Sequence, residues 1–284
     1  MKRFAVRLST AAILSFALVA TAQAQSRPLA TEDPETVPAG FILLEGGFDF
    51  LSGAAFPASG LKGDLFRIGT FGLSIGVNSS VELQVDGGLR RRLSITSFDP
   101  TAPLAGRYTG DIDSTGSFDD LSIGAKIRFV TETESRPAFA LRFATKLPNV
   151  GTETGLGTGT TDFQIALATA KTVRSTRVAA NFGMAIMAEP SVAATQNHLV
   201  TYGASVARAV ATGIELVGEI NGRLDAGDNA GPGTESRGGV RLGGRFTRGP
   251  VRFDGGFLFG ITDLDPDWGF TVGFTWVFKA FEVK

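Results

Sequence analysis

The sequence predicts an all-β fold: a single transmembrane, antiparallel, up-and-down β-barrel of about twelve strands, preceded by a cleaved signal peptide. Three observations lead to this prediction. Segments of alternating apolar and polar residues recur along the chain, as expected where lipid-facing and lumen-facing side chains alternate with a period of two. The connections between them switch regularly between tight turns and longer loops rich in Gly, Pro, Asp and Thr. An export signal opens the chain.

The export signal has three parts. Lys2, Arg3 and Arg7 precede an apolar run at 11–20, and Ala22-Gln23-Ala24 forms a small-x-small cleavage site. This order is typical of a secretory signal peptide. The alternative, a retained helix, is disfavoured because the apolar run is shorter than the roughly 20 residues that span a bilayer.

Cleavage also changes the charge of the chain. The signal carries three positive charges and no negative ones, so its removal takes the formal net charge from −1 to −4. A weakly acidic chain lacks the basic surface of a nucleic-acid-binding protein. The sequence therefore divides into a signal peptide (1–24), a flexible N-terminal segment (25–38), a transmembrane barrel (39–278) and a short C-terminal tail (279–284).

Composition agrees with a barrel and excludes several chemistries. The chain has no cysteine, so it has no disulfide, no thiolate nucleophile and no cysteine metal site. Its 23 Phe suit a lipid-facing band, and its 37 Gly suit the bends and close approaches of a curved sheet. The mature part has no apolar run long enough for a spanning helix. A soluble β-sandwich shares the alternation and is the alternative for the fold.

The first strands are placed by parity. In the first, Ile42 and Phe48 face one side while Glu45 and Asp49 face the other. A wall between lipid and water demands this alternation, because a slip of one residue would move every charge into hydrocarbon. The first six strands are expected at about 40–51, 64–77, 81–89, 120–129, 139–146 and 162–167.

The later strands continue this contrast, with two departures in the whole series. The segment 199–210 is rich in alanine and alternates weakly. In the second strand, Arg67 shares parity with Phe71, so a bulge near Gly69 is expected to switch the faces. The last six strands are expected at about 177–186, 199–210, 214–221, 240–246, 251–259 and 270–278.

The connections sort into two sets, and an even strand number leaves both chain ends on the periplasmic side. The tight turns are expected at 78–80, 131–136, 171–176, 211–213 and 248–250. The longer, extracellular loops are expected at 52–63, 94–116, 148–160, 189–196, 223–235 and 262–269.

Parity also predicts which polar side chains line the lumen. The predicted lumen-lining residues are Glu45, Asp49, Glu82, Gln84, Asp86, Arg90, Asp120, Lys126, Arg128, Arg142, Lys146, Asp162, Gln164, Arg177, Asn181, Glu215, Glu219, Asn221, Arg241, Arg245, Arg252 and Asp254.

Some of these charges are expected to form cross-strand ion pairs. In an antiparallel hairpin, directly paired residues have residue numbers with a constant sum, and opposite charges on one face stabilise each other. Such pairs either fill the interior or set a local field for a permeating solute. The predicted pairs are Glu215–Arg245 and Glu219–Arg241 in one hairpin, and Glu82–Arg128 and Arg90–Asp120 in another.

The last strand carries a more specific pattern. Thr271, Gly273, Trp276 and Phe278 match the polar-x-Gly-x-x-aromatic-x-aromatic ending of outer-membrane barrels. This resemblance implies an assembly signal that the barrel-assembly machinery recognises. Most such barrels stop at the final Phe, whereas this chain continues to Lys284. An ordinary edge strand is the alternative.

Three patches in the middle of the chain resemble a known family. DDLSIGAKIRF (119–129), LRFATKLP (141–148) and GLGTGTTDFQIAL (155–167) come in the order and spacing of the outer-membrane family labelled "putative MetA pathway of phenol degradation". The resemblance implies a transporter-like barrel that passes aromatic or other apolar small molecules. One departure is Pro148-Asn149-Val150-Gly151, where the family usually has Pro-Thr-Gly. No catalytic residues come with the family.

Enzymatic and ligand motifs are weak. His198 is the single histidine, and no G-x-S-x-G elbow accompanies it, so a Ser/His hydrolase lacks its constellation. The glycine-rich stretch 155–161 lacks the lysine of a phosphate loop. Asp263, Asp265 and Asp267 begin like a calcium loop, but Phe274 stands where the bidentate Glu belongs. A loose extracellular Ca²⁺ site stays open, and no cofactor or metal ligand is assigned.

These observations predict a passive channel for small, aromatic or apolar solutes in the outer membrane of a Gram-negative cell. Its partners are expected to be outer-membrane lipid and lipopolysaccharide, the assembly machinery and a small-molecule solute. Two alternatives remain: a structural or surface-interaction barrel with a blocked lumen, and an outer-membrane hydrolase. Residues 25–38 either hang in the periplasm or fold into the barrel mouth as a plug. The sequence does not determine the solute or the oligomeric state.

Overall fold

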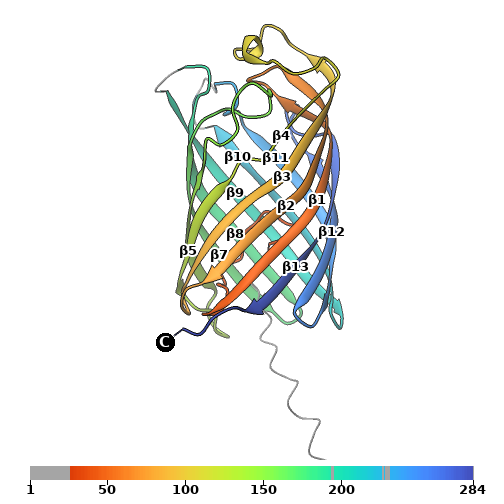
Figure 1. Cartoon of the computed structure of the whole chain (residues 1–284). Coiled ribbons are helices and arrows are strands. Elements are labelled where there is room, and N and C mark those ends of the chain that lie inside the picture. The colour runs from red at the N-terminus through yellow and green to blue at the C-terminus, as the bar shows by residue number, and fades with distance from the viewer. Residues whose placement is uncertain (1–25, 193–194, 226, 228–230, 284) are drawn as a thin grey trace, which may run out of the picture.

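The computed structural model describes residues 26–192, 195–225, 227 and 231–283, so the predicted signal peptide lies outside the described residues. The strands form one closed antiparallel sheet (Figure 1). β1 pairs with β2 on one side and with β13 on the other, which closes the barrel. β4 pairs only with the extension of β3, and the other twelve strands form the wall. The predicted fold class is confirmed.

The strands of the wall are long enough to cross a membrane and to project beyond it. A tilted strand needs roughly 9–11 residues to cross the hydrocarbon. The bounds are β1 (Phe41–Phe56), β2 (Leu61–Gly76), β3 (Val81–Phe98), β4 (Ser114–Ser117), β5 (Ser122–Val130), β6 (Ala138–Lys146), β7 (Asp162–Val173), β8 (Thr176–Ala188), β9 (Gln196–Ala211), β10 (Ile214–Asp225), β11 (Arg237–Arg248), β12 (Val251–Gly260) and β13 (Trp268–Lys279).

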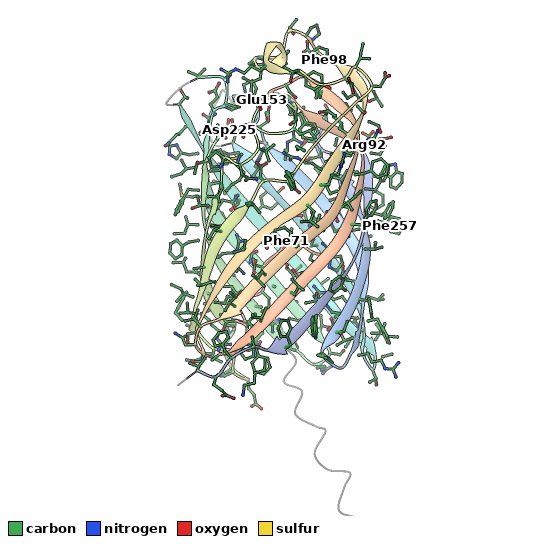
Figure 2. All side chains as sticks on the ribbon, viewed as in Figure 1. Phe71, Arg92, Phe98, Glu153, Asp225 and Phe257 are labelled. Atoms are coloured by element: carbon green, nitrogen blue, oxygen red, sulfur yellow. The ribbon has the colours of Figure 1, made fainter. Side chains whose placement is uncertain are left out.

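The outer face of the wall is apolar, as the parity argument predicts. Phe182 and Phe257 are exposed side chains of β8 and β12, and Figure 2 shows Phe257 projecting away from the barrel. Large exposed apolar surface in water would be a liability, whereas a lipid-facing band needs it. Together with the closed sheet, this face places the barrel in the outer membrane. Within the described residues, no helix is long and apolar enough to cross a membrane.

Tight turns and long loops lie at opposite ends of the barrel (Figure 1). The tight turns are at 77–80, 131–137, 174–175, 212–213 and 249–250, and the C-terminal tail leaves from the same end. This end is therefore periplasmic. The longer loops, including 99–121 and 147–161, gather at the extracellular end.

Two predicted boundaries are wrong near the extracellular end. The expected loop 52–63 is mostly strand, because β1 runs to Phe56 and β2 starts at Leu61. Likewise, β3 continues to Phe98 rather than ending near residue 89. These extensions make the strands longer than the roughly 9–11 residues that a tilted strand needs to cross the hydrocarbon. They pack on a small apolar cluster of Ala54, Leu61, Leu65, Leu93 and Leu156.

The predicted bulge in β2 is confirmed. Gly69 has a φ of +66°, and the register between β1 and β2 shifts between Gly47 and Phe48, opposite it. Glycine adopts this left-handed backbone conformation readily, and the bulge inserts one extra residue into the strand. As a result, both Arg67 and Thr70 point into the lumen, where they meet Asp49 and Arg27.

Candidate functional site

The periplasmic half of the lumen contains the N-terminal segment, residues 26–38. Its polar groups contact wall residues near the periplasmic ends of their strands, such as Glu82 in β3 and Arg177 in β8. The segment starts against β12 and β13, crosses the lumen past β10 and β8, and leaves along β3 to enter β1. The sequence left its position open, and the structure places it inside the barrel.

Arg27 fixes the start of the segment. Its guanidinium donates to the Thr271 hydroxyl (2.8 Å) and lies 3.5 Å from a carboxylate oxygen of Asp254. A Cβ at Gly47 would lie 2.2 Å from this guanidinium, and a Cβ at Gly273 would lie 2.5 Å from it. Only glycine leaves room there, so the wall is shaped to accept the arginine.

The centre of the segment carries acids that meet basic wall residues. The ammonium of Lys126 lies 3.2 Å from Glu32, 3.1 Å from Glu82 and 2.9 Å from the carbonyl oxygen of Asp33. The side chain of Lys126 is 0% exposed. A buried ammonium is stable only when it is paired and hydrogen-bonded. Arg142 adds a second cation 3.3 Å from Glu32.

Arg177 connects the segment to a periplasmic turn. It binds Asp33 through two nitrogens, one of them at 2.7 Å, and lies 2.8 Å from Glu132. Burial alone would raise the pKa of Glu132, but the Thr172 N–H and Arg177 outweigh it and lower that pKa. The anionic form of Glu132 is therefore favoured, and it holds Arg177 through this ion pair. Arg128 makes a similar ion pair with Glu35.

Wall residues also satisfy the peptide groups of the segment. Glu219 accepts the N–H groups of Ala30 (2.7 Å) and Thr31 (2.8 Å), and Glu82 accepts that of Val37 (2.7 Å). Arg245 donates to the carbonyl oxygens of residues 26 and 27. A segment without regular structure can lie inside a barrel only if its backbone donors and acceptors find such partners.

The extracellular half of the lumen contains two cavities. A cavity of about 510 Å³ lies above the segment, and Arg27, Pro28 and Leu29 contribute to its lining. A second cavity of about 280 Å³ adjoins it, since both are lined by Arg223 and Arg237. Loops 57–60 and 147–161 contribute to the upper cavity. A solute entering from outside would pass both cavities before it met the segment.

The family profile described as "Putative MetA-pathway of phenol degradation" matches residues 26–278. The chain belongs to this family. The match starts with the first residue of the segment that the structure describes and ends at the last aromatic residue of β13. The resemblance inferred from the three central patches is confirmed. None of the curated proteins matches the chain.

Solved structures support the barrel assignment of this MetA-pathway family member. The COG4313 outer membrane channel from Pseudomonas putida F1 is similar, with 15% identity, a TM-score of 0.60, and coverage of 87% of this chain and 98% of the other. The NanC porin is also similar, with 6% identity, a TM-score of 0.51, and coverage of 83% and 98%. At these identities the likeness shows the fold.

Most polar residues predicted to line the lumen of the MetA-family barrel make contacts there. Glu219 and Arg241 are direct cross-strand partners with ion-pair atoms 3.0 Å apart, and Glu215 and Arg245 are partners at 3.7 Å. Both predicted pairs are confirmed. Other predicted residues found in lumen contacts are Glu45 with Arg252, Asp49 with Arg67, Asp86 with Arg142, Lys146 with Asp162, Gln84 with Arg142, and Asn181 with Glu32.

The second set of predicted pairs is wrong. Glu82 is opposite Lys126 rather than Arg128, because the β3–β5 register is displaced by two residues. Residues 99–121 contain β4 and a short 3-10 helix, so this long connection does not set the register as a simple hairpin would. Arg90 is exposed, and its neighbour Arg91 is the one that reaches Asp120 (3.6 Å).

The remaining predicted positions make fewer contacts. Gln164 is exposed, although Asp162 on the same parity is buried. Asn221 lines the larger cavity. In β13, Thr271 and Gly273 face Arg27, whereas the rings of Trp276 and Phe278 contact each other in a tilted arrangement with centroids 4.4 Å apart.

Sequence reasoning missed two groups of lumen residues. The first is the acids and the arginine of the segment, since nothing in a short polar stretch indicates that it lies inside a barrel. The second is Arg223 and Arg237, which share the parity of Glu219 and Arg241. That parity is a usable signal, but the expected loop 223–235 includes Arg223 and the expected strand 240–246 begins after Arg237, whereas β10 and β11 extend over both residues.

His198, the histidine considered for a hydrolase, lies near the start of β9. It is exposed on β9, opposite Ile186. Among the described residues, no group of three or more His, Cys, Asp and Glu side chains could hold a metal ion. The carboxylate of Asp265 instead accepts hydrogen bonds from Gly238 and Thr262.

Proposed function

We propose that this barrel is an outer-membrane channel for passive passage of small solutes, with residues 26–38 as a movable plug in its periplasmic half. One observation carries the proposal: two adjoining cavities lead from the extracellular loops to a floor formed by the segment. A barrel with a purely structural role would not need an open vestibule above a polar, separately anchored segment. Membership of the MetA-pathway family supports small aromatic molecules as the solutes.

The contacts of the segment suit a plug that can leave. They are ion pairs and hydrogen bonds, such as Arg177 with Asp33 and Glu219 with the Thr31 N–H. Each of these hydrogen bonds to a charged group contributes about 1.5–3 kcal/mol net, because water replaces the lost partner. An apolar plug would have no such replacement. Apolar contacts also hold the segment, because Leu29 and Pro34 are buried and Val37 packs against Leu43 at its end.

A filled periplasmic half also favours the alternative, a surface-interaction barrel with a permanently blocked lumen. The two functions differ in one respect: the channel requires the segment to move. A covalent lock on the segment therefore separates them.

The chain offers a suitable site for this lock. A Cβ built at Gly203 would lie 3.6 Å from the Cβ of Thr31, within the roughly 3.5–4.5 Å of a disulfide. The absence of other cysteines makes the double substitution Thr31→Cys with Gly203→Cys selective. We expect the mature double variant in a planar bilayer to be silent when oxidised and to conduct after reduction.

Three controls complete the experiment. The two single cysteine variants should conduct under both conditions, and deletion of residues 25–38 should give steady conductance. Mass spectrometry should confirm the disulfide in the silent form. Equal conductance of the oxidised and reduced double variant would refute the plug. A folded barrel that stays silent without residues 25–38 would support the blocked-lumen alternative.

Two further assignments belong to this proposal. The role is non-enzymatic, and His198→Ala should leave conductance unchanged. Thr271, Gly273, Trp276 and Phe278 form the signal for the assembly machinery, with lipopolysaccharide around the extracellular rim. Replacing Phe278 by Ala should lower the amount of assembled barrel in cells more than it lowers refolding in detergent.

A further inference from the structure

We infer that the larger extracellular cavity binds small organic anions, carboxylates with an apolar body, between Arg223 and Arg237. This inference rests on the proposed function, because it names the solute class that the vestibule would accept. It starts from the placement of two like charges. Arg223 on β10 and Arg237 on β11 are direct cross-strand partners, an arrangement that is destabilising without a compensating charge.

The nearest acids are Glu235 and Asp265, whose charges act on both arginines, but among the described residues neither acid makes an ion pair with them. Both guanidiniums are held by neutral groups. Arg223 donates to the carbonyl oxygens of Glu235 (3.0 Å) and Gly233 (3.1 Å), and Arg237 to those of Leu264 (2.6 Å) and Ala55 (3.0 Å). Within the described part of the chain, neither forms an ion pair, although a distance of 4.0 Å would suffice.

Neighbouring arginines of the same cavity differ in this respect. Arg241 is paired with Glu219 (3.0 Å) and Arg67 with Asp49 (3.0 Å). The other acid of the cavity, Asp265, accepts hydrogen bonds from the N–H of Gly238 (2.9 Å) and from the hydroxyl of Thr262 (2.8 Å). These hydrogen bonds hold one oxygen of its carboxylate, Oδ2, against the loop.

The hydrogen bonds to carbonyl groups position the two guanidiniums without neutralising them. Each guanidinium has five N–H donors in a fixed fork, and the contacts above leave several unused. Such a fork matches a carboxylate in bidentate fashion. The pair is thus preorganised for an anion, since its side chains are already held in place before a ligand arrives.

The rest of the lining indicates what the anion carries. Leu51 and Leu258 provide apolar surface in the same cavity. Its volume of about 510 Å³ lies within the roughly 300–1,000 Å³ of small-molecule sites. A one-ring aromatic carboxylate would place its carboxylate on the arginine pair and its ring on this apolar surface. A neutral aromatic alcohol would leave the two charges uncompensated.

Titration calorimetry on the detergent-solubilised mature protein tests this inference, with benzoate as the probe and benzyl alcohol as its neutral counterpart. We expect saturable benzoate binding that is at least tenfold tighter than that of benzyl alcohol. The double variant Arg223→Gln with Arg237→Gln should lose at least tenfold in benzoate affinity. The matched control is Arg92→Gln, which removes the same charge from an exposed position on β3.

Each result decides the inference. Equal binding of the two probes, or full benzoate affinity in the double variant, would overturn it. Heat-dependent gel mobility shows whether the double variant is folded, and the single variant Arg237→Gln serves if it is not. The cavity opens to the extracellular side, so this binding does not need the plug to move. Benzoate binding with a silent channel would therefore refute the proposed function alone, and conductance without benzoate binding would refute this inference alone.

Discussion

The two halves of the lumen differ in how their charged side chains are held. In the periplasmic half, charged wall residues meet opposite charges on residues 26–38, and Lys126 is completely buried between two glutamates. In the extracellular half, Arg223 and Arg237 are held by carbonyl oxygens around an open cavity. The ion-paired side chains fill the periplasmic half, whereas the two arginines, which make no ion pair among the described residues, lie beside a cavity and are suited to bind a ligand.

This difference explains how a barrel can hold a plug without a hydrophobic core. A buried ion pair is expensive to desolvate, but removing one partner costs more because it leaves the other charge buried and alone. The filled half is therefore sensitive to single substitutions. The extracellular half is expected to be less sensitive to single substitutions, because water and ions reach its charges.

The largest expected effect is on stability. Glu82→Leu removes a buried partner of Lys126 and the acceptor of the Val37 N–H. We expect a loss of about 3–5 kcal/mol in the free energy of unfolding, measured by urea titration of the refolded barrel. The control is Glu215→Leu, whose side chain is 37% exposed and lies 3.7 Å from Arg245. It should cost less than about 1 kcal/mol. Equal losses would mean that burial of the ion pair does not determine its cost.

The second effect is on the plug. Arg177→Gln removes both hydrogen bonds to Asp33. A charge-assisted hydrogen bond contributes about 1.5–3 kcal/mol, and 1.4 kcal/mol is a factor of ten. We expect the open probability in a planar bilayer to rise roughly 10–100-fold. Lys146→Gln is the control, because Lys146 pairs with Asp162 and lines the upper cavity, away from the segment. A similar rise in both variants would mean that the contacts of the segment do not control the open probability.

The sequence predicts the wall better than its contents. Lipid imposes a strict period of two, so the strands and the ion pair of Glu219 with Arg241 follow from parity and from a short hairpin. Where the strands leave the membrane this constraint ends. Arg91 rather than Arg90 then faces inward, and β3 runs on to Phe98.

The contents of the lumen escape prediction for a different reason. Residues 26–38 have no periodicity, and their position depends on contacts such as Glu32 with Lys126, which join residues distant in the sequence. No local pattern in the segment identifies those partners. Arg223 and Arg237 could be placed on the inner face by parity, but their contacts with the carbonyl groups of Glu235 and Leu264 depend on loop folds that the sequence does not predict.

The smallest expected effect is that of salt, and it distinguishes the two halves directly. Raising ionic strength from 0.1 to 1 M shortens the Debye length from about 10 to about 3 Å. Benzoate affinity at Arg223 and Arg237 should fall a few-fold by calorimetry, because solvent ions reach the cavity. The open probability of the wild-type channel should change less, since Lys126 and Glu82 are shielded from solvent at 0% exposure. A larger change in open probability than in benzoate affinity would mean that ions penetrate the contacts of the segment, and the plug would then be held by screened surface charges.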